Sequence, residues 1–371
     1  MWLERDKSVP LHAYMMCYRC VSLIIFVIPL AVNELSCGQL VYSFISANPV
    51  RLAHVDVTLY NPRQTNRISL ELSIAQNNIW TREHTFSNAE TCRLFTYGFD
   101  GEITEQRFLV SYRPVSRLTF SFCSSIFIIS GGFMDPGIET FHNALGIRDH
   151  QRPLAKKNQV NINLNNSALL TQPFVINSVP RLKTSYTLIR KRFVSADTFI
   201  SLLPLTGGID RRVTLSPEGA IGIDSIFGFN RFQLVSSVAA MYLGFSNYSR
   251  HALTVNPWQA GFIFAAILKI GVSTSFQFTT KYLSAMYTRE AWYIAGSSQL
   301  TSNEYVSSGL PALFDSTKWF ALSLCHRSRS PAPSFMIFIN EDSGIRKIRP
   351  LAMEANDSPD LGVGLTLFIE K

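Results

Sequence analysis

Charged and histidine side chains crowd one segment of the sequence between Gly131 and Pro153. On a helix over 138–145, Glu139 and His142 would lie one turn apart, a spacing that can bind a metal or pair a base with the group that orients it. Folded into a pore, the same charges could form a constriction that selects ions. The third interpretation is a plain outer loop with a helical turn and an Arg–Asp pair. The candidate residues are Gly131, Gly132, Phe133, Asp135, Glu139, His142, Arg148, Asp149, Gln151 and Arg152.

A second set of polar and charged residues lies at alternate positions within apolar stretches, so its members would share one face of β-strands. In a barrel that face is the lumen. Such side chains can line a channel, or pair into a plug that fills the interior, and the sequence leaves both open. The set consists of Glu71, Glu105, Arg107, Asp224, Gln277 and Lys281.

No pattern for catalysis accompanies these residues. The sequence has no GxSxG, no Walker A motif, no GxGxxG after a strand, no HExxH and no EF-hand loop. His326, beside Cys325 and Ser328, is the one histidine near a serine on an expected strand, and its place at a turn is wrong for a Ser–His site. We therefore expect no enzymatic activity, no cofactor and no metal site.

The elements that carry these residues are expected to be β-strands. The segment from Glu102 begins as a hairpin of 103–113 and 118–129, turning at 113–117. In its second arm one face has Leu118, Phe120, Phe122, Ile126 and Ile128, and the other has Thr119, Ser121, Cys123 and Ser125. This period of two predicts a long strand with one apolar face.

The same alternation recurs along the chain, with long and short connections between the runs. Further strands are expected at 68–75, 182–192, 198–205, 220–227, 232–243, 258–268, 272–281, 319–325, 335–340 and 361–369. A turn is expected at 194–197, and the polar and aromatic stretch 77–101 is placed outside the membrane. Together with the hairpin, the strands number twelve, or fourteen if Val160, Ile162 and Leu164 begin another membrane hairpin.

Composition favours a membrane protein of this kind. The chain has 371 residues, of which 47% are hydrophobic and only 16% charged. After Val32 no stretch approaches the about 18 consecutive apolar residues of a spanning helix. We therefore expect an all-β fold: an antiparallel up-and-down transmembrane β-barrel with long extracellular loops and short periplasmic turns. Aromatic residues near strand ends fit its interface girdles, namely Trp80, Trp258, Trp319, Tyr242 and Tyr282.

The N-terminal segment reads as an export signal. Arg19 precedes an apolar run over 21–32 and then small residues over 36–38, the order of a secretory signal peptide. We expect a signal peptide at 1–38, with 1–14 as a possible over-long leader, and a single barrel domain over 39–371. A lipoprotein attached through Cys37, and an anchoring or buried helix, are the alternatives.

The distribution of charge indicates which kinds of partner the protein could have. The net charge of +8 is spread over scattered positions, which suggests a cation-lined pore, contacts with anionic lipid headgroups or an ordinary solvated surface. No dense basic run with aromatics supports nucleic-acid binding.

Outside 1–38 the cysteines are Cys92, Cys123 and Cys325, and their odd number without CxxC spacing allows one disulfide but does not imply it.

Four fragments in the first half of the chain form a recognisable set: Asp100-Gly101-Glu102, Gly131-Gly132-Phe133-Met134-Asp135, Phe141-His142 and the run from Arg148 to Pro153. With them the sequence resembles an uncharacterised family of Gram-negative outer-membrane proteins. The resemblance implies an outer-membrane barrel in contact with lipid and lipopolysaccharide, and it supplies no substrate. The apolar alternation that ends at Ile369 is similar to the signal read by the barrel-assembly machinery.

The expected function is that of a passive channel or small-molecule uptake pore for an unknown solute. The alternative is a closed structural barrel with a plugged lumen that maintains the envelope. A third possibility, an exported soluble β-sandwich, would bury the apolar rows between two stacked sheets.

Overall fold

A computed structural model describes residues 68–88, 94–145, 159–164, 168–177, 180–191, 193–204, 206–207, 213–214, 217–229, 231–244, 256–271, 273–284, 292–294, 317–328, 333–341 and 361–370. The expected signal peptide at 1–38 lies outside the described residues. Among the described residues, no helix is both long and apolar enough to cross a membrane.

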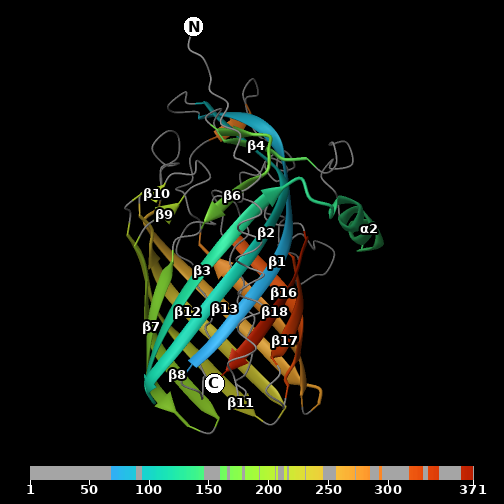
Figure 1. Ribbon diagram of the computed structural model, residues 1–371. Helices are drawn as coiled ribbons and strands as arrows, with labels where there is room; N and C mark the ends of the chain where they lie inside the picture. Colours follow the sequence, from blue (N-terminus) through green and yellow to red (C-terminus); the bar gives the residue numbers. More distant parts are fainter. Residues whose placement is uncertain are drawn as a thin grey trace, which may run out of the picture.

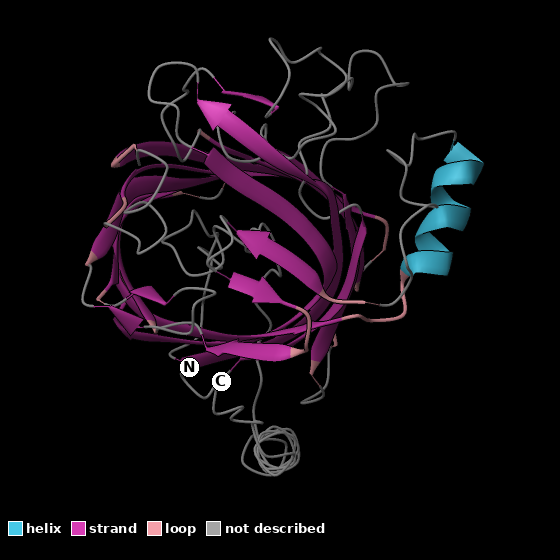
Figure 2. Cartoon of the chain, turned by 90° about the horizontal axis from the view of Figure 1, so that it is seen from above, coloured by secondary structure: helices cyan, strands magenta, loops and turns pink. Residues whose placement is uncertain are grey.

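Twelve strands form a closed antiparallel barrel, whose tilted strands are seen from the side in Figure 1 and as a ring in Figure 2. They are β1 (Ile68–Asn88), β2 (Leu94–Val115), β3 (Leu118–Ser130), β7 (Arg181–Arg190), β8 (Val194–Leu203), β11 (Glu218–Phe229), β12 (Phe232–Tyr242), β13 (Trp258–Lys269), β14 (Thr274–Leu283), β16 (Thr317–His326), β17 (Ser334–Glu341) and β18 (Leu361–Glu370). Each strand pairs with the next in this order, and β1 pairs with both β2 and β18. The predicted fold class and strand number are therefore confirmed.

The remaining strands are short and do not belong to the ring of twelve. They are β4 (Asn161–Leu164), β5 (Ala168–Leu170), β6 (Phe174–Asn177), β9 (Thr206–Gly207), β10 (Val213–Thr214) and β15 (Trp292–Ile294). β4 pairs with the outer part of β2, at Tyr97–Asp100, and then with β5. Four residues cannot span a bilayer, which needs about 9–11 per strand. The alternative of fourteen membrane strands is therefore wrong.

The first two strands are far longer than the others. β1 has 21 residues and β2 has 22, and their pairing runs from Ile68↔Tyr112 to Ser87↔Leu94. Their far ends rise above the rest of the barrel together with β4 (Figure 1). The stretch expected only as an outer segment at 77–101 is thus largely a continuation of this hairpin.

Short turns join strands at one end of the barrel and long connections at the other (Figure 1). The turn expected at 194–197 is misplaced. The backbone amide of Lys191 donates to the carbonyl oxygen of Val194 over 2.8 Å, and β8 begins there. Ser195 and Asp197 are buried and face inward, and they alternate with exposed or half-buried neighbours. The segment predicted to be a turn is therefore part of the strand.

The outer face of the barrel is a continuous apolar surface. Large side chains exposed on it include Ile74, Phe120, Leu182, Ile200, Ile223, Val238, Leu268, Leu322, Ile337 and Leu365. Soluble monomers rarely expose apolar patches beyond a few hundred Å². At one edge, Tyr242 and Trp258 are paired across β12 and β13 with ring centroids 5.2 Å apart, as expected of an aromatic girdle. The rows are not buried between stacked sheets, so the β-sandwich alternative is wrong.

A single described helix, α2 (Asp135–Leu145), stands outside the barrel wall (Figures 1 and 2). The carboxylate of Glu102 on β2 accepts a hydrogen bond from the backbone amide of Met134, and another from Nε2 of Gln76 at 2.6 Å. Nδ2 of Asn78 donates to Oδ1 of Asp135 over 3.0 Å. Met134 and Ile138 pack against Ile339 of β17. These contacts fix the start of α2 to the outside of β1, β2 and β17.

Replacing Gly132 by Ala is expected to loosen this attachment. Gly132 has φ +63°, and a Cβ there would collide with the carboxyl group of Glu102. We expect the free energy of local opening to fall by about 1–3 kcal/mol. Faster hydrogen exchange of the amides from 133 to 138 measures this change. In the control Gly137→Ala, the new methyl group meets nothing within 4 Å, so the same amides should keep or gain protection. Equal exchange in the two variants would contradict the expectation.

Candidate functional site

The inner wall of the barrel gathers most of the polar residues expected to face the lumen. Of that set, Glu105, Arg107, Asp224, Gln277 and Lys281 are buried on inward-facing positions. They face inward because strand side chains alternate and their neighbours on each strand carry the apolar outer rows. Glu71 shares this face and is half-buried.

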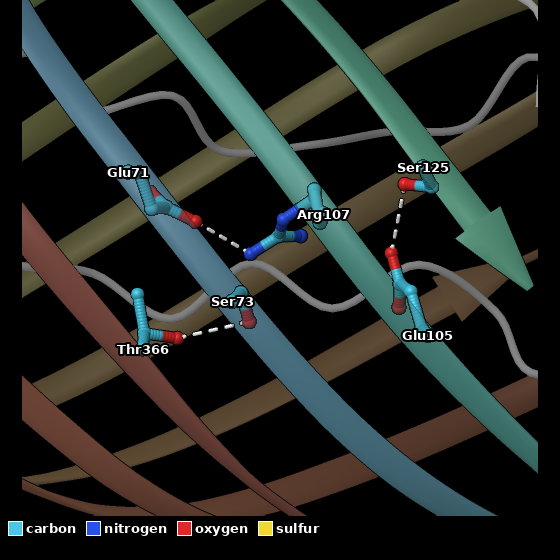
Figure 3. Close-up of polar contacts among 6 residues, drawn as sticks. All are labelled: Glu71, Ser73, Glu105, Arg107, Ser125 and Thr366. Atoms are coloured by element: carbon cyan, nitrogen blue, oxygen red, sulfur yellow. Dashed lines mark hydrogen bonds and ion pairs between the residues drawn. The ribbon is translucent and has the colours of Figure 1, made fainter. Parts of the chain in front are cut away.

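One ion pair joins the first two strands. Nη2 of Arg107 on β2 lies 2.6 Å from Oε1 of Glu71 on β1, as Figure 3 shows. The two side chains are only 5% and 12% exposed. In the same region Thr366 of β18 donates to the hydroxyl of Ser73 over 3.0 Å, which ties β18 to β1 inside the lumen.

A second group of charges surrounds Glu105. Its carboxylate accepts a hydrogen bond from Ser125 at 3.0 Å (Figure 3) and is attracted by the charges of Arg107, Arg181 and Lys281. All four charged residues are at most 7% exposed. We refer to Glu105, Arg107, Arg181 and Lys281 as the central charge cluster.

A further ion pair connects β7 with β11 across the inner face of β8. Nζ of Lys183 lies 2.7 Å from Oδ2 of Asp224, with side-chain exposures of 1% and 2%. The same ammonium group sits 3.8 Å from the ring centroid of Phe199 on β8, a cation–π contact. Asp197 lies directly opposite Asp224 in the β8–β11 register.

Five charged lumen residues were missed by the sequence analysis. They are Arg113, Arg181, Lys183, Asp197 and Glu218, all buried. The signal that could have found them is the alternation itself, because each lies two residues from another inward position. Arg181 and Lys183, for example, flank the exposed Leu182.

Among the described residues, most of the charge on the inner wall lies on one half of the barrel. Among the described residues, the buried or half-buried inward charges lie on β1, β2, β7, β8 and β11, apart from Lys281 on β14. On β12, β13, β16, β17 and β18, the described side chains that are buried on the inner face are apolar or uncharged polar. These include Val235, Met241, Ile263, Ile267, Ser323, Phe338, Asn340 and Thr366.

Many inward polar atoms have no hydrogen-bond partner within the described protein. They are Ser195 Oγ, Asp197 Oδ1, Asp224 Oδ1, Gln233 Nε2 and Oε1, Ser237 Oγ, Gln277 Oε1, Ser323 Oγ and Asn340 Oδ1. Buried polar atoms in folded proteins are almost always hydrogen-bonded, to protein or to ordered water. The inner wall is therefore chemically suited to hold water.

The segment singled out as a possible constriction lies elsewhere. Its described part, 131–145, runs along the outside of the barrel and ends in α2, so these residues do not narrow the lumen (Figure 2). Phe133 is 75% exposed, and Glu139 is half-buried. Arg148, Asp149, Gln151 and Arg152 lie outside the described residues. Within the described part of the chain, no group of three or more His, Cys, Asp or Glu could hold a metal.

Cys123 and Cys325 are buried on the inner wall as reduced thiols. Cys92 lies outside the described residues.

No family model matches the sequence, and no curated protein matches it. Among solved structures, the chain is similar to the COG4313 outer membrane channel from Pseudomonas putida F1, with 9% identity, 84% of this chain and 99% of that chain covered, and a TM-score of 0.48. A Pseudomonas aeruginosa FadL homologue is 10% identical over 90% and 99% of the two chains, with a TM-score of 0.38. OprD from Pseudomonas aeruginosa is 9% identical over 83% and 95%, with a TM-score of 0.29.

Proposed function

We propose that this chain is an outer-membrane barrel that lets small solutes cross passively through its polar interior. The membrane location is supported by the apolar outer surface, since a closed barrel is one of the two structures that can satisfy all backbone groups in lipid. Lipid and lipopolysaccharide would contact that surface. Export through residues 1–38 and recognition of β18 by the barrel-assembly machinery belong to the same proposal.

The observation that carries the channel function is the chemistry of the inner wall. Its buried polar atoms without protein partners, such as those of Gln233 and Ser237, favour bound water rather than a dry core. A hydrated, charged interior inside an apolar shell is what a solute pathway requires. Lys281 and Gln277 are both 0% exposed, so a pathway past them would have to be narrow and its solute small.

The proposed transport involves no chemical reaction. The charged groups of the inner wall are engaged with one another, as in the pairs Arg107–Glu71 and Lys183–Asp224. They would act on a solute through their fields, not as nucleophile or base.

Conductance in planar lipid bilayers tests the proposal. Purified protein that is folded, as judged by different gel migration before and after boiling, should give discrete single-channel steps. Liposomes that contain it should also swell in small neutral solutes. A folded barrel with neither conductance nor solute flux would contradict the channel function.

The second candidate is a closed structural barrel, which the burial of the two ion pairs favours. The side chains of Lys183 and Asp224 are exposed by 1% and 2%, as expected of groups that brace a filled interior. This candidate predicts no conductance, together with an outer membrane that becomes fragile when the protein is deleted.

A further inference from the structure

We infer that the inner wall carries a binding site for an ammonium group, formed by Asp197, Asp224 and Ser237. We refer to these three residues as the ammonium site. As a statement about the solute, the inference rests on the proposed function and deepens it: the molecules that pass would include small primary amines.

The three residues lie side by side on the inner wall. Their strands β8, β11 and β12 are consecutive neighbours in the barrel. In the strand registers Asp224 is directly opposite Asp197 on one side and Ser237 on the other. Residues that are directly opposite on one face of neighbouring strands have Cβ atoms about 4.5–5.5 Å apart. The residues Asp197, Asp224 and Ser237 face inward and are exposed by 6%, 2% and 0%.

Each of the three side chains has one oxygen atom without a hydrogen-bond partner within the described protein. These atoms are Oδ1 of Asp197, Oδ1 of Asp224 and Oγ of Ser237. The other contacts of the carboxylates are a hydrogen bond from Thr187 to Asp197, and the ion pair of 2.7 Å between Nζ of Lys183 and Oδ2 of Asp224. Buried oxygens almost always have a hydrogen-bond partner, and like charges directly opposite each other are destabilising. A ligand that is positively charged and donates hydrogen bonds would satisfy both requirements.

An ammonium group matches these acceptors in number. It carries one positive charge, three N–H donors and no acceptor, so it offers one donor to each oxygen. A hard metal ion fits less well, because Ca²⁺ takes about six to eight oxygen ligands and Mg²⁺ requires octahedral geometry. Arg113 and Arg190 also attract the carboxylate of Asp197, and a bound ammonium group would share this carboxylate with them.

Lys183 provides a precedent for an ammonium group on this wall. Its Nζ lies 2.7 Å from Asp224 and 3.8 Å from the ring centroid of Phe199. Lys183 reaches Asp224 from β7, across the inner face of β8, whereas Ser237 lies on the β12 side of Asp224. The lysine occupies Oδ2 of Asp224, and the ammonium site uses Oδ1.

Thermal unfolding of the full-length barrel in detergent tests the site, because a ligand that binds only the folded state raises the unfolding midpoint as its concentration increases. Methylammonium chloride should raise the midpoint relative to potassium chloride at equal ionic strength. Tetramethylammonium chloride should not, because this ion has the same charge but no N–H group.

Two variants should weaken the response to methylammonium, measured for each protein against its own midpoint in potassium chloride. In D197N the methylammonium concentration that produces a given shift should rise about tenfold, since one hydrogen bond to a charged group is lost. The new amide can also donate to Oδ1 of Asp224 and so replace the ligand. In S237A the same concentration should rise about threefold, because one hydrogen bond from a hydroxyl oxygen is lost.

The matched controls are E139Q and S323A. E139Q changes the net charge as D197N does, but Glu139 is on α2, outside the barrel wall. Oγ of Ser323 is also buried without a partner within the described protein, but it is on β16, away from the ammonium site. Both variants should respond to methylammonium as the wild type does.

Equal midpoints in methylammonium and tetramethylammonium would overturn the inference. A shift that both D197N and S237A leave unchanged would do the same, as would stabilisation by calcium chloride but not by methylammonium. If D197N does not fold, the response of S237A decides. A barrel that conducts without binding methylammonium keeps the proposed function and loses the site, whereas one that binds without conducting keeps the site and loses the proposed function.

Discussion

The variant Asp224→Asn should lose about 3–5 kcal/mol of unfolding free energy, the usual cost of removing one partner from a buried ion pair. The variant removes the carboxylate that lies 2.7 Å from Nζ of Lys183, whose side chain is only 1% exposed. The contact of Lys183 with the ring of Phe199 at 3.8 Å remains, but that interaction is too weak to replace an ion pair. Urea unfolding of the barrel in lipid vesicles measures the change.

The double variant Lys183→Met with Asp224→Asn provides the control. Removing both charges should recover much of the loss, because no ammonium group then remains buried without a counter-ion. Glu71→Gln is a second comparison and should cost less, since the side chain of Glu71 is 12% exposed and water reaches it. Equal losses in the single and double variants would show that the pair itself does not determine the stability.

The variant Ile223→Arg should destabilise the barrel by about 2–4 kcal/mol, as charged residues do on the lipid face near the bilayer midplane. Ile223 lies in the middle of β11, is 52% exposed and pairs with the equally exposed Val238 on β12. In a water-soluble protein the same change at such an exposed position would alter stability by about 0.5 kcal/mol or less. The variant therefore distinguishes lipid from water at the outer face.

Ile270→Arg is the matched control for this substitution. Ile270 is 59% exposed and follows β13 at a short turn, where the chain leaves the membrane. We expect a cost near 0–1 kcal/mol there, the range found at membrane interfaces. A small effect at both positions in vesicle unfolding experiments would contradict a lipid-facing outer wall.

Local alternation was sufficient to predict the barrel strands. Along a barrel strand the side chains alternate between apolar and polar, as Phe120 and Ser121 do, because one face meets lipid and the other meets the lumen. The long ends of β1 and β2 escaped prediction for the same reason. Above the membrane both faces can be polar, so the stretch around Asn77–Gly101 loses the alternation although it continues as strands.

Contacts between distant strands could not be predicted. Asp224 was recognised as facing the lumen, but its partner Lys183 lies 41 positions earlier on a strand that is not its neighbour. The placement of α2 was also beyond the sequence. The pattern over 131–153 is compatible with both an outer loop and a constriction, and the choice depends on how Glu102 holds the amide of Met134.

The join between β1 and β18 also determines when the barrel can be completed. The hydrogen bond from Thr366 to Ser73 spans 293 positions, so the ring cannot close until two segments that lie far apart in the sequence come together. Pairings between such remote segments form slowly, because a large loop must be ordered first. Until then both β1 and β18 present unpaired edges that can aggregate. The chain is therefore expected to need a holding chaperone during its passage to the membrane.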